Sequence, residues 1–151
     1  MSFKEKNILV TLTSFSLIFL FFILRMFQLF QNDAFVPTKV FQIWGVVIVL
    51  SIVVTIIAMI LTHGTIAAIQ AIRTKDANYE YDDSEDERDT LIDLKGTNIT
   101  YTFSSLGVFF AMLSYVFGQP PLIMFSLLVF FGLLAQIVGD IARLMFYRKG
   151  F

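Results

Sequence analysis

Long uncharged stretches separated by short polar segments dominate the chain. The first stretch covers 7–30, begins just after Lys4 and Lys6, and contains only Arg25 as a charged residue. No Asp, Glu, Lys or Arg lies in 40–72 or in 96–139. About 18 apolar residues suffice for a helix that crosses a bilayer, and 40–72 would form a helix of about 50 Å against a hydrocarbon core of about 30 Å. The pattern therefore predicts membrane-spanning helices, the second of which must protrude, tilt or bend.

Two turn signals complete the division into spans. Pro37 suits the first turn of a new helix, and the sequence Gly118-Gln119-Pro120-Pro121 splits the last uncharged stretch because its prolines cannot continue a helix. We therefore expect a single four-span domain, 1–151, with spans at about 7–30, 38–72, 97–117 and 122–147. The predicted fold class is all-α: an integral membrane four-helix bundle with a short cytoplasmic amphipathic helix before the third span.

Basic residues predict the orientation of these spans. Lys and Arg near span ends are retained in the cytoplasm. With the N-terminus inside, the outer side would carry only Arg25 and Lys39. The cytoplasmic side would carry the other nine, Lys4, Lys6, Arg73, Lys75, Arg88, Lys95, Arg143, Arg148 and Lys149. The pattern predicts a multi-pass protein of the cell membrane with both termini in the cytoplasm.

Small residues at helical spacing predict how the spans pack. Helices in a membrane associate where small side chains let their backbones approach closely. One such row in the third span is Ser104, Gly107, Ala111, Ser114 and Gly118, and one in the fourth is Gly132, Ala135, Gly139 and Ala142. Since a short turn makes these spans antiparallel neighbours, we expect the two rows to face each other.

Composition narrows the chemistry. The chain is 57% hydrophobic and 15% charged, contains no cysteine and has one histidine. Thiol chemistry is excluded, no metal-ligand spacing or nucleophile–base pair is present, and the charge balance does not favour direct nucleic-acid binding. The sequence predicts a protein that is not an enzyme and that has no cofactor.

A polar layer is predicted at the cytoplasmic ends of the spans. Gln136, Asp140 and Arg143 lie along one side of the fourth helix. His63 reaches a similar depth, and so do Thr97, Asn98 and Thr100 at the inner end of the third span; the candidate residues of the layer are His63, Asn98, Gln136, Asp140 and Arg143. One interpretation is a set of interfacial residues satisfied by water, headgroups and one another, with Asp140 pairing Arg143. The other is a small proton-, ion- or ligand-responsive site, because intramembrane charges often serve function.

The segment 73–96 forms an acidic cytoplasmic loop and helix. Ser84 followed by Glu87 fits a capping box and predicts a helix that begins near Ser84 and runs toward the third span through or near Gly96. Arg88 is a lone basic residue among acids. It could pair locally with Glu85 or reach Asp140 across the bundle.

Part of this segment resembles a known signature. The run Asp86-Glu87-Arg88-Asp89-Thr90-Leu91-Ile92-Asp93-Leu94-Lys95 is similar to the D-E-R-D/N-x-x-I-x-x-K motif of small four-span membrane proteins of unknown function in bacteria and archaea. Matching positions are Asp86, Glu87, Arg88, Asp89, Ile92 and Lys95. The resemblance implies no enzymatic activity, and it implies at most a signalling or regulatory role beside small helix-turn-helix regulators.

These observations favour a non-enzymatic membrane protein that acts through its acidic cytoplasmic segment. Its partners would be the lipid bilayer and a cytosolic regulator or another membrane protein. The alternative is a small transporter or channel subunit that works as a homo-oligomer. The middle of every span is apolar, which makes a single copy a poor pore.

Overall fold

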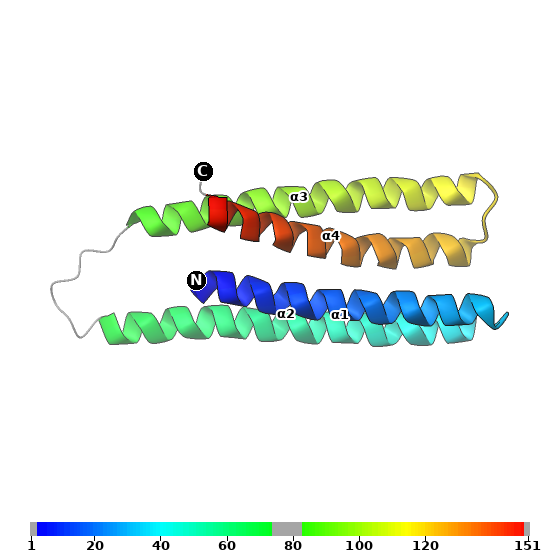
Figure 1. The fold of residues 1–151 in the computed structure, drawn as a ribbon, viewed down its shortest axis with the longest axis horizontal. Coiled ribbons are helices and arrows are strands. Elements are labelled where there is room, and N and C mark those ends of the chain that lie inside the picture. The colour runs from blue at the N-terminus through cyan, green and yellow to red at the C-terminus, as the bar shows by residue number, and fades with distance from the viewer. Residues whose placement is uncertain (1–2, 74–82, 150–151) are drawn as a thin grey trace.

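The protein folds into four long α-helices that run side by side. The computed structural model describes residues 3–73 and 83–149, and it describes side chains for 4–61 and 87–149. The helices are α1 (Phe3–Gln31), α2 (Pro37–Arg73), α3 (Asp83–Val116) and α4 (Pro121–Lys149). No strand occurs within the described ranges (Figure 1). The prediction of an all-α four-helix bundle is confirmed.

All four helices are long and apolar enough to cross a membrane. At 1.5 Å per residue, α1 and α4 measure about 43 Å, α3 about 51 Å and α2 about 56 Å, against a hydrocarbon core of about 30 Å. Most of their large apolar side chains face outward rather than into the bundle, as a lipid environment requires. The chain is a multi-pass membrane protein.

The helix ends form two distinct sides. The start of α1, the end of α2, the start of α3 and the end of α4 lie at one end of the bundle, which we call the terminal end (Figure 1). The other end, the turn end, holds the α1–α2 and α3–α4 connections. At the terminal end α2 and α3 extend beyond α1, so the excess length of α2 is accommodated by protrusion of an unbroken helix.

The acidic helix and the third span are one element. α3 begins at Asp83, one residue before Ser84, and continues through Gly96 to Val116 without interruption. The predicted short helix before the third span is therefore the first part of the spanning helix itself. The side chains of Ser84 and Glu85 lie outside the described ones, so the capping box stays a prediction.

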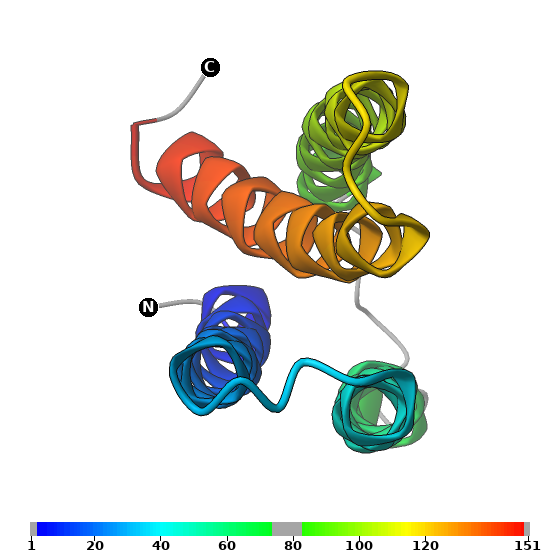
Figure 2. The same cartoon turned by 90° about the vertical axis from the view of Figure 1, so that its right-hand side faces the viewer.

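The four helices are not equivalent. Viewed along the bundle, α4 lies between α3 and α1, and α2 lies beside α1 (Figure 2). α3 packs on α4, α1 packs on both α4 and α2, and α2 touches α4 only sparsely. Within the described ranges α2 and α3 do not pack on each other. The bundle is therefore open along its α2–α3 side.

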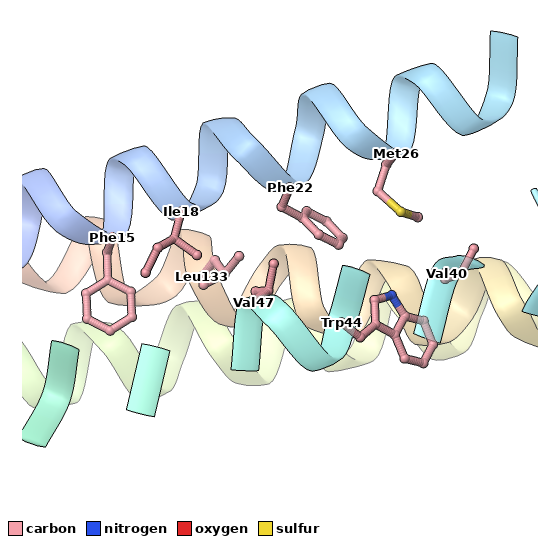
Figure 3. Close-up of a cluster of buried hydrophobic side chains, with 8 residues drawn as sticks. All are labelled: Phe15, Ile18, Phe22, Met26, Val40, Trp44, Val47 and Leu133. Carbon is pink, nitrogen blue, oxygen red and sulfur yellow. The ribbon is translucent and has the colours of Figure 1, made fainter. Parts of the chain in front are cut away.

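The apolar core lies where α1, α2 and α4 meet. α1 contributes Phe15, Ile18, Phe22 and Met26 at helical spacing, α2 contributes Val40, Trp44 and Val47, and α4 contributes Leu133 (Figure 3). The Trp44 ring meets the rings of Phe41 and Phe125 in edge-on contacts. These aromatic contacts each contribute about 0.5–1.5 kcal/mol beyond the area they bury.

Glycines bring α3 and α4 together. A Cβ atom at Gly107 would overlap the Phe131 side chain, and one at Gly139 would overlap the Thr100 hydroxyl. The prediction that these rows lie at the contact between the two spans is confirmed at these positions, although each glycine meets a larger side chain of the other helix rather than the opposite row. It is wrong for Gly132, which has open space around it and faces a groove instead.

Both connections at the turn end are built from left-handed residues. Gly118 has φ +84°, its N–H donates to the Tyr115 carbonyl (3.0 Å), and the Gln119 N–H donates to the Ser114 carbonyl (3.1 Å). These bonds form a Schellman cap that ends α3 before the two prolines. Asp33 (φ 50°) ends α1 similarly, with the Ala34 N–H donating to Leu29 (3.0 Å).

Candidate functional site

A cluster of charged and polar side chains lies inside the terminal end of the bundle. We call it the polar cluster. It comprises residues from α1, α3 and α4, namely Lys4, Asp89, Asp93, Thr97, Gln136, Asp140 and Arg143. Every other buried side chain among the described residues is apolar except Ser126, whose hydroxyl donates to its own helix. Among the described residues, this cluster therefore contains the buried charged side chain of the bundle, Asp140.

Asp140 is the most deeply buried charged residue of the cluster. Only 3% of it is exposed. Its Oδ1 accepts hydrogen bonds from Gln136 Nε2 (3.2 Å) and Arg143 Nη1 (2.9 Å), one turn away on either side of the same helix. Its Oδ2 is buried and has no hydrogen-bond partner within the described structure. A buried carboxylate oxygen without a donor is costly and calls for an explanation.

Thr11 is the nearby hydroxyl of α1. It lies beside the Asp140 carboxylate and lines the same pocket. Its single hydrogen goes to the Ile8 carbonyl at 2.9 Å. Because a threonine hydroxyl has one hydrogen to donate, Thr11 cannot donate to Asp140 while it donates to Ile8.

Arg143 ties α4 to α3. Besides Asp140, its guanidinium meets Asp93 (Nε–Oδ1 3.5 Å) and donates from Nη2 to the Thr97 hydroxyl (3.0 Å). The arginine side chain crosses α3 at Gly96, where a Cβ would overlap it. Glycine at this position leaves room for the Arg143 side chain against α3. Each of the three guanidinium nitrogens of Arg143 has a contact, with Asp93, Asp140 or Thr97.

Lys4 ties α1 to α3. Its ammonium forms an ion pair with Asp89 at 2.5 Å, and both side chains are partly buried. Exposed ion pairs contribute little to stability, but a partly buried pair is less screened by solvent. Two ion pairs therefore hold the start of α3 against the rest of the bundle.

A pocket opens onto this cluster. Its volume is about 500 Å³, and all four helices contribute to its walls. Lys4, Thr11, Asp93, Asp140 and Arg143 supply polar groups, and Phe15, Thr55 and Ala58 close its inner side. Among the residues searched within the described part, no group of three His, Cys, Asp or Glu side chains could hold a metal ion.

The structure unites part of the predicted polar layer. Gln136, Asp140 and Arg143 are joined by hydrogen bonds along α4, as their spacing indicates. Asn98 is exposed on another face of α3, and Thr97 takes the inward position instead. His63 lies on α2, and its side chain is outside the described ones. Of the two ways in which Arg88 could pair, the one across the bundle is not formed, because the ion-pair partner of Asp140 is Arg143 of its own helix.

The signature residues divide between two faces of α3. Asp89 pairs with Lys4, Ile92 is fully buried, and the Lys95 ammonium lies 5.8 Å from the Phe146 ring centre. Glu87 and Arg88 are exposed. The side chain of Asp86 lies outside the described ones. Of the five motif residues whose side chains are described, three contact the bundle and two, Glu87 and Arg88, face away from it.

Sequence reasoning missed Lys4, Asp89, Asp93 and Thr11 as members of one site. From the sequence, Lys4 bears only on orientation, Asp89 belongs to the signature motif, and Asp93 belongs only to the acidic segment. A helical projection from Asp89 would have placed Asp93, Gly96 and Thr97 near one face, since Asp93 follows Asp89 by four residues and Gly96 and Thr97 follow Asp93 by three and four.

Comparisons with known proteins yield no relative: no family model, no curated protein and no solved structure matches the chain.

Proposed function

We propose that the protein is a non-enzymatic regulatory membrane protein and that the first turns of α3 are its interaction surface. The single observation that carries this proposal is the division of those turns into a bonded inner face and an open outer face. Both termini and this surface would lie in the cytoplasm.

The outer face offers mixed chemistry to a partner. Leu91 and Leu94 are 53% and 56% exposed, and they share a face with exposed Glu87 and Asn98 at helical spacing. Polar residues around two exposed leucines are typical of a face that docks on another helix or groove. A surface of this kind favours a specific protein partner.

The inner face links such a partner to the rest of the molecule. Asp89 and Asp93 contact α1 and α4 through Lys4 and Arg143, and α3 continues as a rigid helix to the turn end. A partner that shifts the start of α3 would have to alter these two ion pairs. This connection supports a regulatory role over passive tethering.

Photo-cross-linking in intact cells tests the proposal. A photoreactive amino acid placed at Leu94 is expected to give a discrete adduct with one partner protein, and one placed at Leu106, in the spanning part of α3, is expected to give lipid adducts. Exchanging Glu87 and Arg88 (Glu87→Arg with Arg88→Glu) keeps the net charge and should abolish the partner adduct. Lipid adducts alone at Leu94 would refute the proposal, because the face would then lie on the membrane surface.

The orientation has its own test. Since the natural chain contains no cysteine, a single cysteine at Glu87 or at Gln119 gives an unambiguous label with a membrane-impermeant maleimide. We expect labelling of whole cells at Gln119→Cys and labelling at Glu87→Cys only after permeabilisation. The reverse result would place the surface outside the cell.

The alternative function, a transporter or channel subunit acting as an oligomer, is favoured by one observation: the polar pocket reaches a buried carboxylate. Proteoliposomes test it directly. Cation or proton flux that Asp140→Asn abolishes and Asp33→Asn preserves would support transport over regulation.

A further inference from the structure

An apolar groove continues from the polar pocket into the membrane part of the bundle. The groove has a volume of about 470 Å³ and lies between α2 and α4, with α1 behind it. Phe15, Thr55 and Gln136 belong to the walls of both spaces, so the groove and the pocket adjoin. Together they form one elongated site that is apolar along most of its length and polar at one end.

Gly132 forms part of the groove wall. It has no neighbouring atom within van der Waals reach of an added Cβ, although α4 is closely packed at Gly139, two turns further along the helix. The small residues Ser51 and Thr55 line the groove from α2, with their hydroxyls bonded to carbonyls of their own helix. Apart from Gln136 at its polar end, the groove therefore presents carbon-rich walls whose hydroxyls are already bonded, which suits an alkyl chain.

Asp140 defines what the polar end can bind. Oδ2 lacks a hydrogen-bond donor, and Thr11 lines the same pocket as Asp140. Each nitrogen of Arg143 already has a contact and Lys4 is paired with Asp89, so both cations already have anionic partners. With ionised side chains, the three aspartates of the cluster outnumber its two cations.

We propose that this site binds a single-chain primary amine, with the ammonium on Oδ2 of Asp140 and the alkyl chain in the groove. An ammonium has three donors and makes short, charge-assisted bonds to carboxylates. A quaternary ammonium has the charge but no donor, and an alcohol has a donor but no charge. The inference is independent of the proposed interaction surface.

The depth of the site matches this ligand. Asp140 lies about 27 Å along α4 from Leu122, near one edge of a hydrocarbon core of about 30 Å. Gly132 lies two turns deeper, about 12 Å further into the membrane. An amine in the leaflet at the terminal end would thus place its ammonium at Asp140 and its alkyl chain along the groove. The distance of about 12 Å from Asp140 to Gly132 corresponds to a chain of about ten carbons.

Competition photolabelling of the full-length protein in nanodiscs tests the proposal. The probe is decylamine that carries a diazirine in its chain, and labelled positions are mapped by peptide mass spectrometry. We expect labels on residues of the groove wall, such as Ile52 and Val129. Decylamine should displace the probe at concentrations at least tenfold lower than decanol or decyltrimethylammonium.

Matched variants separate the two ends of the site. Asp140→Asn should weaken displacement at least tenfold, whereas Asp33→Asn, at the turn end, should leave it unchanged. Gly132→Leu fills open space and should abolish groove labelling even if Asp140→Asn proves unstable. Gly45→Leu is its control, because Gly45 also has open space and lies outside the groove.

Three results of these experiments would overturn the proposed amine site. Equal displacement by decanol, or equal labelling of Asp140→Asn and Asp33→Asn, would show that Oδ2 does not bind the ammonium. Labelling that is unaffected by Gly132→Leu would show partitioning into lipid only. Cross-linking at Leu94 reports on the interaction surface alone, so the failure of either proposal is distinguishable from the failure of the other.

Discussion

Replacing Arg143 with methionine should lower the free energy of unfolding, because it leaves the buried Asp140 carboxylate without its ion-pair partner. Methionine keeps an unbranched stem where the arginine lies across Gly96, so the change removes mainly the guanidinium. The Asp140 side chain is 4% exposed, and its remaining donor would be Gln136. An uncompensated carboxylate would then stay in the bundle interior.

The size of the effect follows from what Arg143 contacts. Removing one member of a buried ion pair typically costs about 3–5 kcal/mol because it leaves an unpaired charge. We expect about 3 kcal/mol, at the low end of that range, since Gln136 still donates to Asp140. The contact with Asp93 adds little because that side chain is 63% exposed. Loss of an ordinary interhelical hydrogen bond in a membrane costs only about 0.6 kcal/mol. The measured cost therefore distinguishes an unpaired buried charge on Asp140 from the simple loss of the bond to Thr97.

A double-mutant cycle identifies the cause. Arg143→Met combined with Asp140→Leu replaces the pair with apolar residues and should be more stable than Arg143→Met alone. The free energy of unfolding would be measured by SDS titration of the full-length protein in mixed micelles, with helicity followed by circular dichroism. Arg148→Met, on the exposed end of α4, is the matched control. A cost below about 1 kcal/mol for Arg143→Met, or no rescue in the double variant, would refute the reasoning.

The same assay checks two further predictions. Gly139→Val should cost about 2 kcal/mol because the new side chain overlaps Thr100, whereas Gly132→Val should change stability by less than about 0.5 kcal/mol; equal effects would contradict the close α3–α4 contact. Gly118→Ala should cost about 1 kcal/mol because φ +84° disfavours a side chain. A neutral Gly118→Ala would show that the Schellman cap is not needed to end α3.

The helices themselves were predictable because long uncharged stretches identify membrane spans. Uncharged runs far longer than a hydrocarbon core needs leave few alternatives to helices, and Gly118 with its following prolines marks the turn between α3 and α4. The openness between α2 and α3 was not predictable. The apolar faces of α2 and α3 are equally suited to lipid and to helix packing, so their pattern does not choose between the two.

Within the site, contacts along one helix were predictable and contacts between helices were not. The bonds from Gln136 and Arg143 to Asp140 follow from spacings of four and three. Thr97 and Asn98 are adjacent in the sequence and differ by about 100° around the helix. Choosing between them requires the rotation of α3 against α4, which is fixed by the close contacts of Gly107 and Gly139.

The position of α4 explains why the polar row lies on this helix. α4 is the element that packs on α3 and α1 and also meets α2, so a side chain on its inner face can contact the others. Arg143 uses this position to hold Asp93 and Thr97 of α3 while it shares Asp140 with the pocket. Ligand binding at Oδ2 of Asp140 would therefore affect a carboxylate whose partner, Arg143, also contacts α3, the helix that carries the proposed interaction surface. If the two proposals describe one mechanism, Arg143→Met will uncouple amine binding from cross-linking at Leu94, whereas Arg148→Met will not.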